Sequence, residues 1–251
     1  MKKILIIGDS CTDIFEYGRC ERLSPEAPVP IFSPTKTIGN GGMSINVMEN
    51  LRALGVECDI ITNDIRPVKT RYVDEVSNQM LLRVDMRDDV FQIDEDILNK
   101  IDFTQYYAVV ISDYNKGFLS EENIMYISDK HNLVFMDTKK SIGKWAFGIE
   151  FIKINNDEFN KNVDFLLKEY EGELIITLGK EGAMHWMTKY LIDEEHEVRD
   201  LSGAGDTFFA AFIANYINYT DICAAIKYAN KCASWVVTQK GVVVVDKTKI
   251  V

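Results

Sequence analysis

The segment Leu201-Ser202-Gly203-Ala204-Gly205-Asp206-Thr207 leads directly into an apolar stretch that continues to Ile217. Because Ala204–Ile217 is apolar on nearly every side, we predict a buried helix there. Glycines at the entrance of a helix let backbone N–H groups point at an anion, and the helix dipole favours negative charge at that end. The segment therefore favours an anion-binding turn followed by a core helix.

Asp206 would lie on the first turn of this helix. A carboxylate repels phosphate, so it has little use in simple phosphate binding. It is useful as a base that takes a proton from a hydroxyl group while nearby N–H groups stabilise a phosphoryl group in transfer. An N-cap after a flexible turn is the alternative, and it is a very common use of aspartate.

Outward from this segment, short apolar runs alternate with amphipathic stretches along the chain. We predict buried strands at Lys3–Ile7, Glu57–Ile61, Tyr107–Ser112, Leu133–Asp137, Phe151–Ile154 and Leu174–Leu178. We predict further helices at Met43–Leu54, Ser120–Lys130, Asn156–Lys168 and Asp221–Val237. Strands that alternate with helices predict an α/β fold with a parallel sheet covered on both faces.

Two regions interrupt this alternation. Val29–Ile38 and Arg71–Asp85 look like antiparallel strands, and they predict a small side sheet, or lid, with strands from about 14–38 and 68–86. The sequence contains no repeat, low-complexity tract or linker. We therefore predict one domain over residues 1–251 with the lid as an excursion.

The composition, with 47% hydrophobic and 27% charged residues, is that of a soluble globular protein. The formal net charge of -11 argues against a nucleic-acid or anionic-membrane partner, because these need a basic surface. The apolar run Ile4–Ile7 is too short for a signal peptide or a membrane span. Five cysteines without a CxxC pair, and no secretion signal, predict reduced thiols and a cytoplasmic protein.

A second glycine cluster, Gly39-Asn40-Gly41-Gly42, also opens a predicted helix, on which Asn46 could offer its amide to a ligand hydroxyl. A tight turn without a ligand is the alternative. Neither glycine segment is a P-loop, and neither has the GxGxxG pattern of a dinucleotide-binding turn.

Two carboxylates follow the first predicted strand, Asp9 directly and Asp13 four residues later. Open α/β sheets bind ligands at the carboxyl ends of their strands, so these residues could hold sugar hydroxyls. They could equally be solvated loop residues.

Five short motifs occur in the order typical of ribokinase-like (PfkB) carbohydrate kinases: Gly8-Asp9 with Asp13, Gly41-Gly42 with Asn46, Asn155 with Glu158, Thr177-x-Gly179 with Gly182, and Gly203-Ala204-Gly205-Asp206. The chain resembles this family along essentially its whole length. The resemblance implies a three-layer α/β sandwich with a mostly parallel central sheet and a small antiparallel β lid. It also implies that Val242–Val245 is the last strand.

The resemblance implies a role for each motif. Asp206 would be the catalytic base, and the backbone N–H groups of Gly203, Ala204 and Gly205 would form the anion hole. The sugar would be held by Asp9, Asp13, Gly41, Gly42 and Asn46. Asn155 and Glu158 would organise Mg²⁺ and the phosphates of ATP, with Glu158 acting on the metal indirectly. The nucleotide would further contact Thr177, Gly179, Gly182 and Asn230, and Asp200 falls where many relatives bind a monovalent cation such as K⁺.

A closer resemblance rests on Leu23–Pro30, Val68–Arg71, Leu81–Asp85 and Ser112–Gly117, which are similar to the heptose 7-phosphate kinase domain of bifunctional ADP-heptose synthesis enzymes. That domain phosphorylates the anomeric hydroxyl. The nucleotidyltransferase domain of those enzymes is expected to be absent.

An acidic protein that handles a sugar phosphate and ATP must concentrate positive charge locally, because a helix terminus contributes only about 0.3–1 kcal/mol. We expect Lys69, Arg71 and Lys116, with Asp113, on the sugar side. Lys139 is expected near the nucleotide phosphates. Each cation alone could instead be a solvated surface charge.

These features predict in-line phosphoryl transfer from MgATP to a sugar hydroxyl by an enzyme that dimerises through its lid. A kinase of another hexose, a fructose phosphate or a nucleoside is the alternative within enzymes. A catalytically silent sugar or nucleotide sensor is the alternative from another class, although a sensor does not need the base Asp206.

Overall fold

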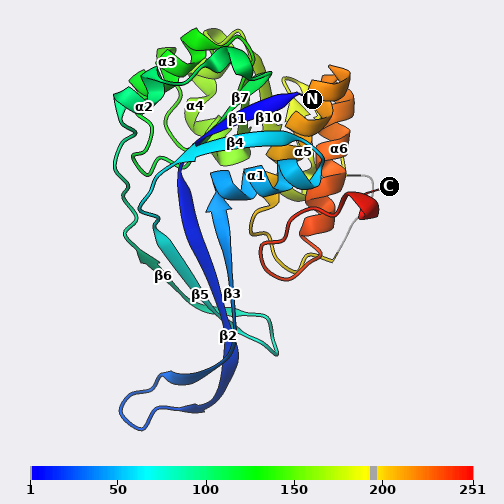
Figure 1. The fold of residues 1–251 in the computed structure, drawn as a ribbon. Helices are drawn as coiled ribbons and strands as arrows, with labels where there is room; N and C mark the ends of the chain where they lie inside the picture. Colours follow the sequence, from blue (N-terminus) through cyan, green and yellow to red (C-terminus); the bar gives the residue numbers. More distant parts are fainter. Residues whose placement is uncertain (1, 193–196, 251) are drawn as a thin grey trace.

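The computed structural model describes residues 2–192 and 197–250. Its centre is an eight-stranded sheet in the order β12-β11-β10-β9-β8-β7-β1-β4, of which Figure 1 labels β1, β4, β7 and β10. The strands are β1 (Lys3–Gly8), β4 (Glu57–Thr62), β7 (Ala108–Asp113), β8 (Val134–Thr138), β9 (Phe151–Asn155), β10 (Glu173–Thr177), β11 (Ala183–His185) and β12 (Thr188–Tyr190). The six strands from β4 to β10 along this order are parallel, and β11 and β12 extend the sheet antiparallel. The predicted parallel sheet is confirmed.

Helices cover both faces of the central sheet, which creates two cores. Residues of α1 (Ser44–Ala53), α5 (Ala204–Tyr219) and α6 (Ile222–Val236) pack in one core. The other core contains residues of α2 (Glu95–Asn99), α3 (Glu121–Lys130) and α4 (Asn156–Lys168). Short 3-10 turns lie at η1 (Phe103–Gln105), η2 (Lys144–Ala146), η3 (Gly179–Glu181) and η4 (Lys247–Lys249). The apolar segment Ala204–Ile217 lies in the buried helix α5, as predicted.

The lid is a separate four-stranded sheet in the order β3-β2-β5-β6. Its strands are β2 (Ser10–Leu23), β3 (Pro30–Met43), β5 (Val68–Asp74) and β6 (Met80–Met86). The pairs β2–β3 and β5–β6 are antiparallel, whereas the two hairpins join through a parallel pair, β2–β5. The predicted antiparallel pairing is thus confirmed within both hairpins, and the pair that joins them is parallel, because β2 and β5 follow β1 and β4, two neighbouring parallel strands of the central sheet.

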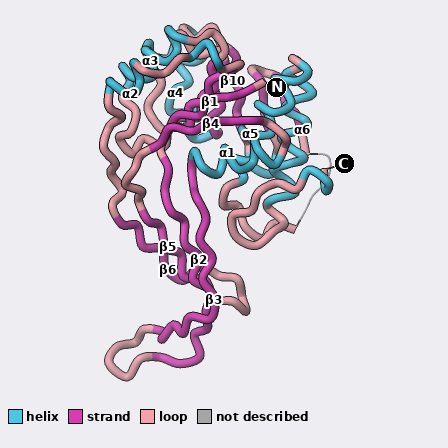
Figure 2. The backbone as a smooth tube through the Cα atoms, in the orientation of Figure 1, coloured by secondary structure: helices cyan, strands magenta, loops and turns pink. Residues whose placement is uncertain are grey.

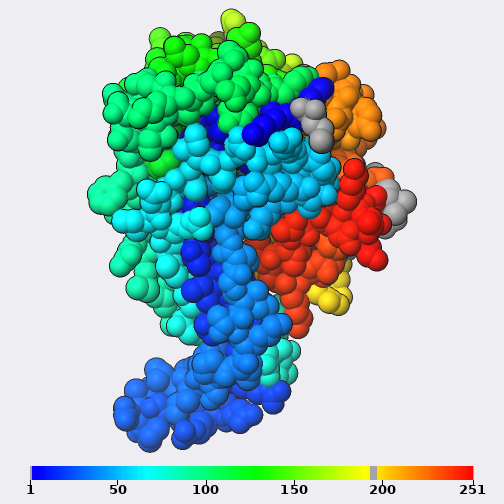
Figure 3. Space-filling view, in the orientation of Figure 1, coloured from blue at the N-terminus to red at the C-terminus, as the bar shows by residue number. Residues whose placement is uncertain are grey.

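The lid strands are longer than their sequence patterns suggested. Figure 2 shows β2 and β3 running from the central sheet far out to the tip of their hairpin. In the space-filling view this tip forms a lobe that stands clear of the body of the molecule (Figure 3). The glycines of residues 39–42 lie inside β3 and not in a turn, and α1 starts at Ser44 directly after them.

The predicted last strand, Val242–Val245, is wrong. The segment belongs to neither sheet. The N–H of Val245 instead donates to the side-chain oxygen of Asn50 in α1, at 2.9 Å. The N–H group of Val245 is therefore not available for a hydrogen bond to a neighbouring strand.

Candidate active site

The carboxylate of Asp206 lies buried on the first turn of α5, where we placed it. The amide of Asn46 donates to its Oδ2 at 2.9 Å, and the hydroxyl of Tyr114 donates to its Oδ1. Burial raises the pKa of Asp206 to about 6, against the two hydrogen bonds, which lower it. A carboxyl group with this pKa is ionised at pH 7 and holds a proton far better than an exposed aspartate, which suits a base.

The turn before α5 has the backbone shape of an anion site. Gly203 has a φ of 79°, and a Cβ at this position would lie 2.8 Å from Nδ2 of Asn46, so only glycine fits. A Cβ on Gly205 would lie 3.3 Å from the ammonium nitrogen of Lys153, which places this cation beside the turn. The N–H of Ala204 is 3.3 Å from the carbonyl oxygen of Leu201. The anion hole remains a prediction, in which Gly203 and Gly205 are the better donors.

A row of alternating charges lies next to this turn. Asp137, at the end of β8, accepts from Lys153 at 2.6 Å and lies 3.3 Å from Lys139. Lys139 continues the row to Glu158 at 2.7 Å. Burial pushes the pKa of Asp137 upwards, but the two ammonium groups outweigh it and hold the pKa below its ordinary value. Lys139 thus lies between Asp137 and Glu158, its place near the nucleotide phosphates remains a prediction, and Lys153 adds a buried cation.

Asn155 and Glu158 form a capping box at the start of α4. The Asn155 side chain accepts from the N–H of Glu158 at 2.8 Å, and Glu158 Oε2 accepts from the N–H of Asn155 at 2.9 Å. These contacts fix the Glu158 carboxylate near Lys139. Mg²⁺ usually keeps several waters and takes one or two carboxylates plus substrate phosphates. One partly engaged carboxylate fits the indirect role that we predicted for Glu158.

Asp9 lies at the carboxyl end of β1 with no exposed surface. Its carboxylate accepts three backbone N–H groups, from Tyr114 at 2.6 Å and from Lys116 and Phe118 at 3.3 Å. Asp9 thus organises the loop of residues 114–118, and direct contact with a sugar remains a prediction.

Asp13 projects from lid strand β2 and pairs with Arg71 of β5 at 2.8 Å. A Cβ at Gly42 would lie 2.8 Å from Oδ2 of Asp13, so the second glycine cluster passes closely over this carboxylate. Gly41 lies next to it in β3, opposite Thr12 of β2. Asn46 connects this region to the base through its contact with Asp206. The structure therefore brings the predicted sugar-binding groups of β2, β3 and α1 together.

Two predicted phosphate-binding lysines converge on one carboxylate. Lys69 of β5 lies 3.4 Å from Oδ1 of Asp88, and Lys116 donates to Oδ2 of the same residue. Lys69 also lies 3.8 Å from Asp85. The lid side of the site thus holds several cations, each of them already paired with a carboxylate.

Asp113, predicted on the sugar side, lies instead in a buried ion pair. Its carboxylate is 2.8 Å and 2.9 Å from the ammonium nitrogen of Lys140 and accepts from the hydroxyl of Thr138. The Asp113 side chain has no exposed surface, and its contacts join the end of β7 to the end of β8. These contacts support a structural role over sugar contact.

The predicted nucleotide loop follows β10. The hydroxyl of Thr177 donates to the carbonyl of Ile154 at 3.3 Å, and Gly179 and Gly182 both have positive φ. The Asn230 amide of α6 donates to the carbonyl of Tyr190 at 2.9 Å and lies close to Gly182. The loop and Asn230 are thus neighbours, as a shared nucleotide site requires.

Asp200 lies in the segment before α5. Its carboxylate accepts the N–H of Ser202 at 2.8 Å and that of Gly241 at 3.2 Å. These bonds join the two loops next to the glycine turn. The monovalent cation remains a prediction, and within the described residues no cluster of three or more His, Cys, Asp or Glu side chains could hold a metal.

Our sequence interpretation missed two residues at the centre of the site, Tyr114 and Lys153. Tyr114 stands inside the Ser112–Gly117 segment that we used for the resemblance, but an aromatic residue in a loop gave no signal of a contact to Asp206. Lys153 occupies a position in a buried strand where apolar residues are expected. A lysine in a buried strand is the signal that could have identified it, since lysine is rarely buried unless it is paired.

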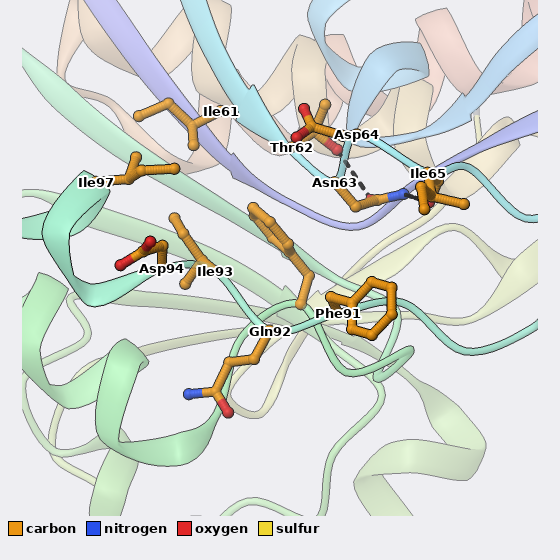
Figure 4. A pocket seen from close by; sticks show the side chains of 11 residues that line it. Ile61, Thr62, Asn63, Asp64, Ile65, Phe91, Gln92, Ile93, Asp94 and Ile97 are labelled. Carbon is orange, nitrogen blue, oxygen red and sulfur yellow. Dashed lines mark hydrogen bonds between the residues drawn. The ribbon is translucent and has the colours of Figure 1, made fainter.

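A separate pocket lies beside β4, between Ile61–Ile65 and the segment from Phe91 to Ile97 (Figure 4). None of the candidate site residues described above lines it.

In the described part of the chain no helix is long and apolar enough to cross a membrane. All five cysteines are free in the structure, and their reduced state stays a prediction.

A buried carboxylate next to a glycine turn, with cations on both sides of it, is typical of an enzyme of the phosphoryl-transfer class. The sequence model of the pfkB family carbohydrate kinases matches residues 83–249, more than half of the chain. The chain belongs to this family of carbohydrate kinases.

Individual relatives agree with this assignment. The chain is 30% identical to the bifunctional protein HldE of Nitratiruptor sp., over 95% of this chain and 62% of that protein. The chain thus spans less than two thirds of that relative. The fold is similar to phosphofructokinase-2 of Escherichia coli, solved with potassium, with a TM-score of 0.76 at 14% identity over 100% and 98% of the chains. It is also similar to Arabidopsis thaliana ribokinase, solved with ribose and ATP, with a TM-score of 0.71 at 14% identity over 96% and 94%.

Proposed function

We propose that Asp206 is the base of this kinase and activates a sugar hydroxyl for attack on the γ-phosphoryl group of ATP. The observation that carries the proposal is the buried Asp206 carboxylate, held by Asn46 and Tyr114 beside the Gly203–Gly205 turn. Each of these elements comes from a different part of the chain, and they meet at the carboxyl ends of the parallel strands.

The chain's own residues then have defined tasks. Asp206 accepts the proton of the hydroxyl as the new O–P bond forms and the bond to the leaving ADP breaks. Lys153 and the glycine turn offset the negative charge of the group in transfer, and Lys139 lies where the nucleotide phosphates would extend towards Glu158. Mg²⁺, when bound with ATP near Glu158, supplies further neutralisation of phosphate charge. Closure of the lid would exclude water.

We propose a heptose 7-phosphate as the substrate, phosphorylated at its anomeric hydroxyl. The similarity to HldE over most of this chain supports a heptose. The pair Lys69 and Lys116, which converges on Asp88, supports a phosphorylated sugar, since two cations from different strands and loops can take one phosphate between them. Arg71 adds a third cation on the lid.

The test is ADP release from MgATP by the purified protein with a panel of heptose 7-phosphate, hexose phosphates, fructose phosphate, free sugars and nucleosides. The control is Asp206→Asn. Turnover on heptose 7-phosphate that disappears in the variant supports base and substrate together. Turnover on another sugar that disappears in the variant supports Asp206 as the base and contradicts the heptose substrate. ATP binding without turnover on any member of the panel favours a sensor.

The family likeness also suggests a monovalent cation near Asp200. The experiment is the same assay in K⁺, Na⁺ and tetramethylammonium salts at one ionic strength. A rate that K⁺ does not raise contradicts the site.

We propose that the protein forms a homodimer through the lid. Strand β6 is exposed along its whole length, and its side chains alternate between two faces. The register places Arg83 opposite Arg71 on the charged face. Leu82 and Val84 belong to the other face, where their side chains are 56% and 37% exposed. An exposed edge strand with an apolar face is a natural contact for a second copy.

Light scattering after size exclusion tests the dimer. Leu82→Asp should convert dimers to monomers, whereas Leu167→Asp, at an equally exposed leucine of α4, should not. A monomeric wild-type protein, or a dimer that survives Leu82→Asp, contradicts the proposal.

A further inference from the structure

We infer that Tyr114 is a positioning residue for the base, and that its hydroxyl keeps the Asp206 carboxylate ionised and oriented towards the substrate hydroxyl. The inference deepens the proposed function and rests on the role of Asp206 in it. It concerns a residue to which our sequence interpretation assigned no role.

The position of Tyr114 is fixed from both ends. Its backbone N–H donates to Asp9 at 2.6 Å, which ties the start of the 114–118 loop to the end of β1. The next residue, Asn115, has a φ of 54°, so the chain reverses immediately after Tyr114. The ammonium group of Lys139 lies 5.6 Å from the centre of the tyrosine ring, within the range of a cation–π contact. The phenol therefore reaches Asp206 from a rigid loop.

The hydrogen bond has one possible direction under working conditions. Burial raises the pKa of Tyr114 well above its ordinary value, and the neighbouring Asp206 charge raises it further. The phenol thus stays protonated and can only donate to the carboxylate. Tyr114 gives its proton to Oδ1 and Asn46 gives one to Oδ2. A carboxylate offers about four lone-pair sites, so two donors leave room for the sugar hydroxyl.

The donors matter because the other groups around Asp206 do not fully compensate for its burial. Asp137 on β8 disfavours ionisation of Asp206, and Lys153 on β9 favours it. Cys11 on β2 also faces Asp206, and burial raises the pKa of its thiol to about 12, so it is neutral. Asn46 on α1 is the remaining donor. Without the Tyr114 hydroxyl, the balance moves towards the protonated carboxyl, which cannot act as a base.

The first experiment is the pH dependence of kcat/KM for wild type and Tyr114→Phe. Loss of a hydrogen bond to a charged group should move the acid limb, expected near pH 6, upwards by about one pH unit. The rate of the variant should then be about elevenfold lower at pH 6 than at pH 8.5, against about twofold for wild type. A residue with a merely structural role would lower the rate by the same factor at every pH.

The matched control is Tyr170→Phe. This tyrosine is also buried and donates its hydroxyl to a backbone carbonyl, that of Ile149 at 2.9 Å, before the start of β9 and away from the site. It should change thermal stability without moving the acid limb. Thermal unfolding of both variants shows that each is folded.

A second measurement separates this inference from the proposed function. The ¹³C carboxyl resonance of Asp206, assigned by its loss in Asp206→Asn, is titrated by NMR in the substrate-free protein. Tyr114→Phe should raise the titration midpoint by about one pH unit, whether or not any sugar on the panel is turned over. A midpoint equal to that of wild type overturns the role of Tyr114. If the midpoint is raised in Tyr114→Phe but the wild-type protein turns over no sugar, Tyr114 does hold the Asp206 carboxylate ionised. The proposed role of Asp206 as a catalytic base is then contradicted.

Discussion

The buried end of the active site and its lid end hold their charges in different ways. At the buried end, Asp137 and Lys153 form an ion pair in which both side chains are about 5% exposed or less. At the lid end, Lys116 and Asp88 are paired with 22% and 45% of their side chains exposed. A buried pair cannot open without exposing an unpaired charge to a dry interior, whereas a partly exposed pair opens into water.

This difference separates two tasks. The buried end is already arranged for chemistry, with Asp206 held by neutral donors and Asp137 held by cations. In the proposed function the lid end must exchange its partners, because a substrate phosphate that binds Lys69 and Lys116 would have to replace Asp88. Substitutions at the buried end should therefore affect turnover or folding strongly, and substitutions at the lid should affect substrate affinity modestly.

The largest effect is expected from Asp206→Asn. The amide cannot accept the hydroxyl proton, so kcat should fall by about 10²–10⁴. Binding of ADP, measured by calorimetry, should change less than twofold, since Asp206 is hydrogen-bonded to Asn46 and Tyr114 and not to Lys139 or Glu158, where we propose the nucleotide phosphates. Near-full turnover of the variant would remove Asp206 as the base.

The next effect is on folding. Lys153→Met leaves Asp137 buried with only the longer contact to Lys139, and unfolding free energy should fall by about 3–5 kcal/mol. Adding Asp137→Asn should recover most of this loss, because it removes the unpaired charge. Urea denaturation of the single and double variants measures both values. The control is Lys168→Met, in an exposed pair with Asp164, which should leave the midpoint unchanged.

The sequence predicted the buried end and the lid end unequally. The alternation of strands and helices was enough for the central sheet, and the glycines before α5 were enough for the position of Asp206, because both depend on local patterns. The roles of Asp113 and Asp9 depend on long-range partners such as Lys140 and the 114–118 loop. No local pattern encodes these contacts. Tyr114 was missed for the same reason, since it acquires its role only when its loop meets α5. Lys153 did carry a local signal, a lysine in a buried strand, but its partner Asp137 could not be inferred from that pattern.

A smaller effect links the base to stability. The pKa of Asp206 is raised by burial from 3.8 to about 6, so the folded protein binds this proton more tightly than the unfolded chain. Stability from this proton is complete below about pH 4 and is lost as the pH rises through 6. The Asp206→Asn variant has no titrating carboxyl at this position, so its stability does not fall in this pH range for that reason. Its stability relative to wild type should be about 3 kcal/mol more favourable at pH 8 than at pH 4. Urea midpoints at the two pH values test this, and a pH-independent difference contradicts the raised pKa.

The smallest effects on activity are expected from substitutions in the lid. They also test whether the lid binds the phosphate group of the sugar. Lys116→Gln should raise the KM for a phosphorylated sugar about tenfold and leave the KM for ATP unchanged, because it removes one charge-assisted contact. Asp88→Asn should act in the opposite direction and lower the KM about threefold, since the carboxylate no longer competes with the phosphate for the two lysines. The matching free sugar should be insensitive to both substitutions. If phosphorylated and free sugars respond equally, the lysines only fix the 114–118 loop against the lid, and the preference for a sugar phosphate must come from another part of the site.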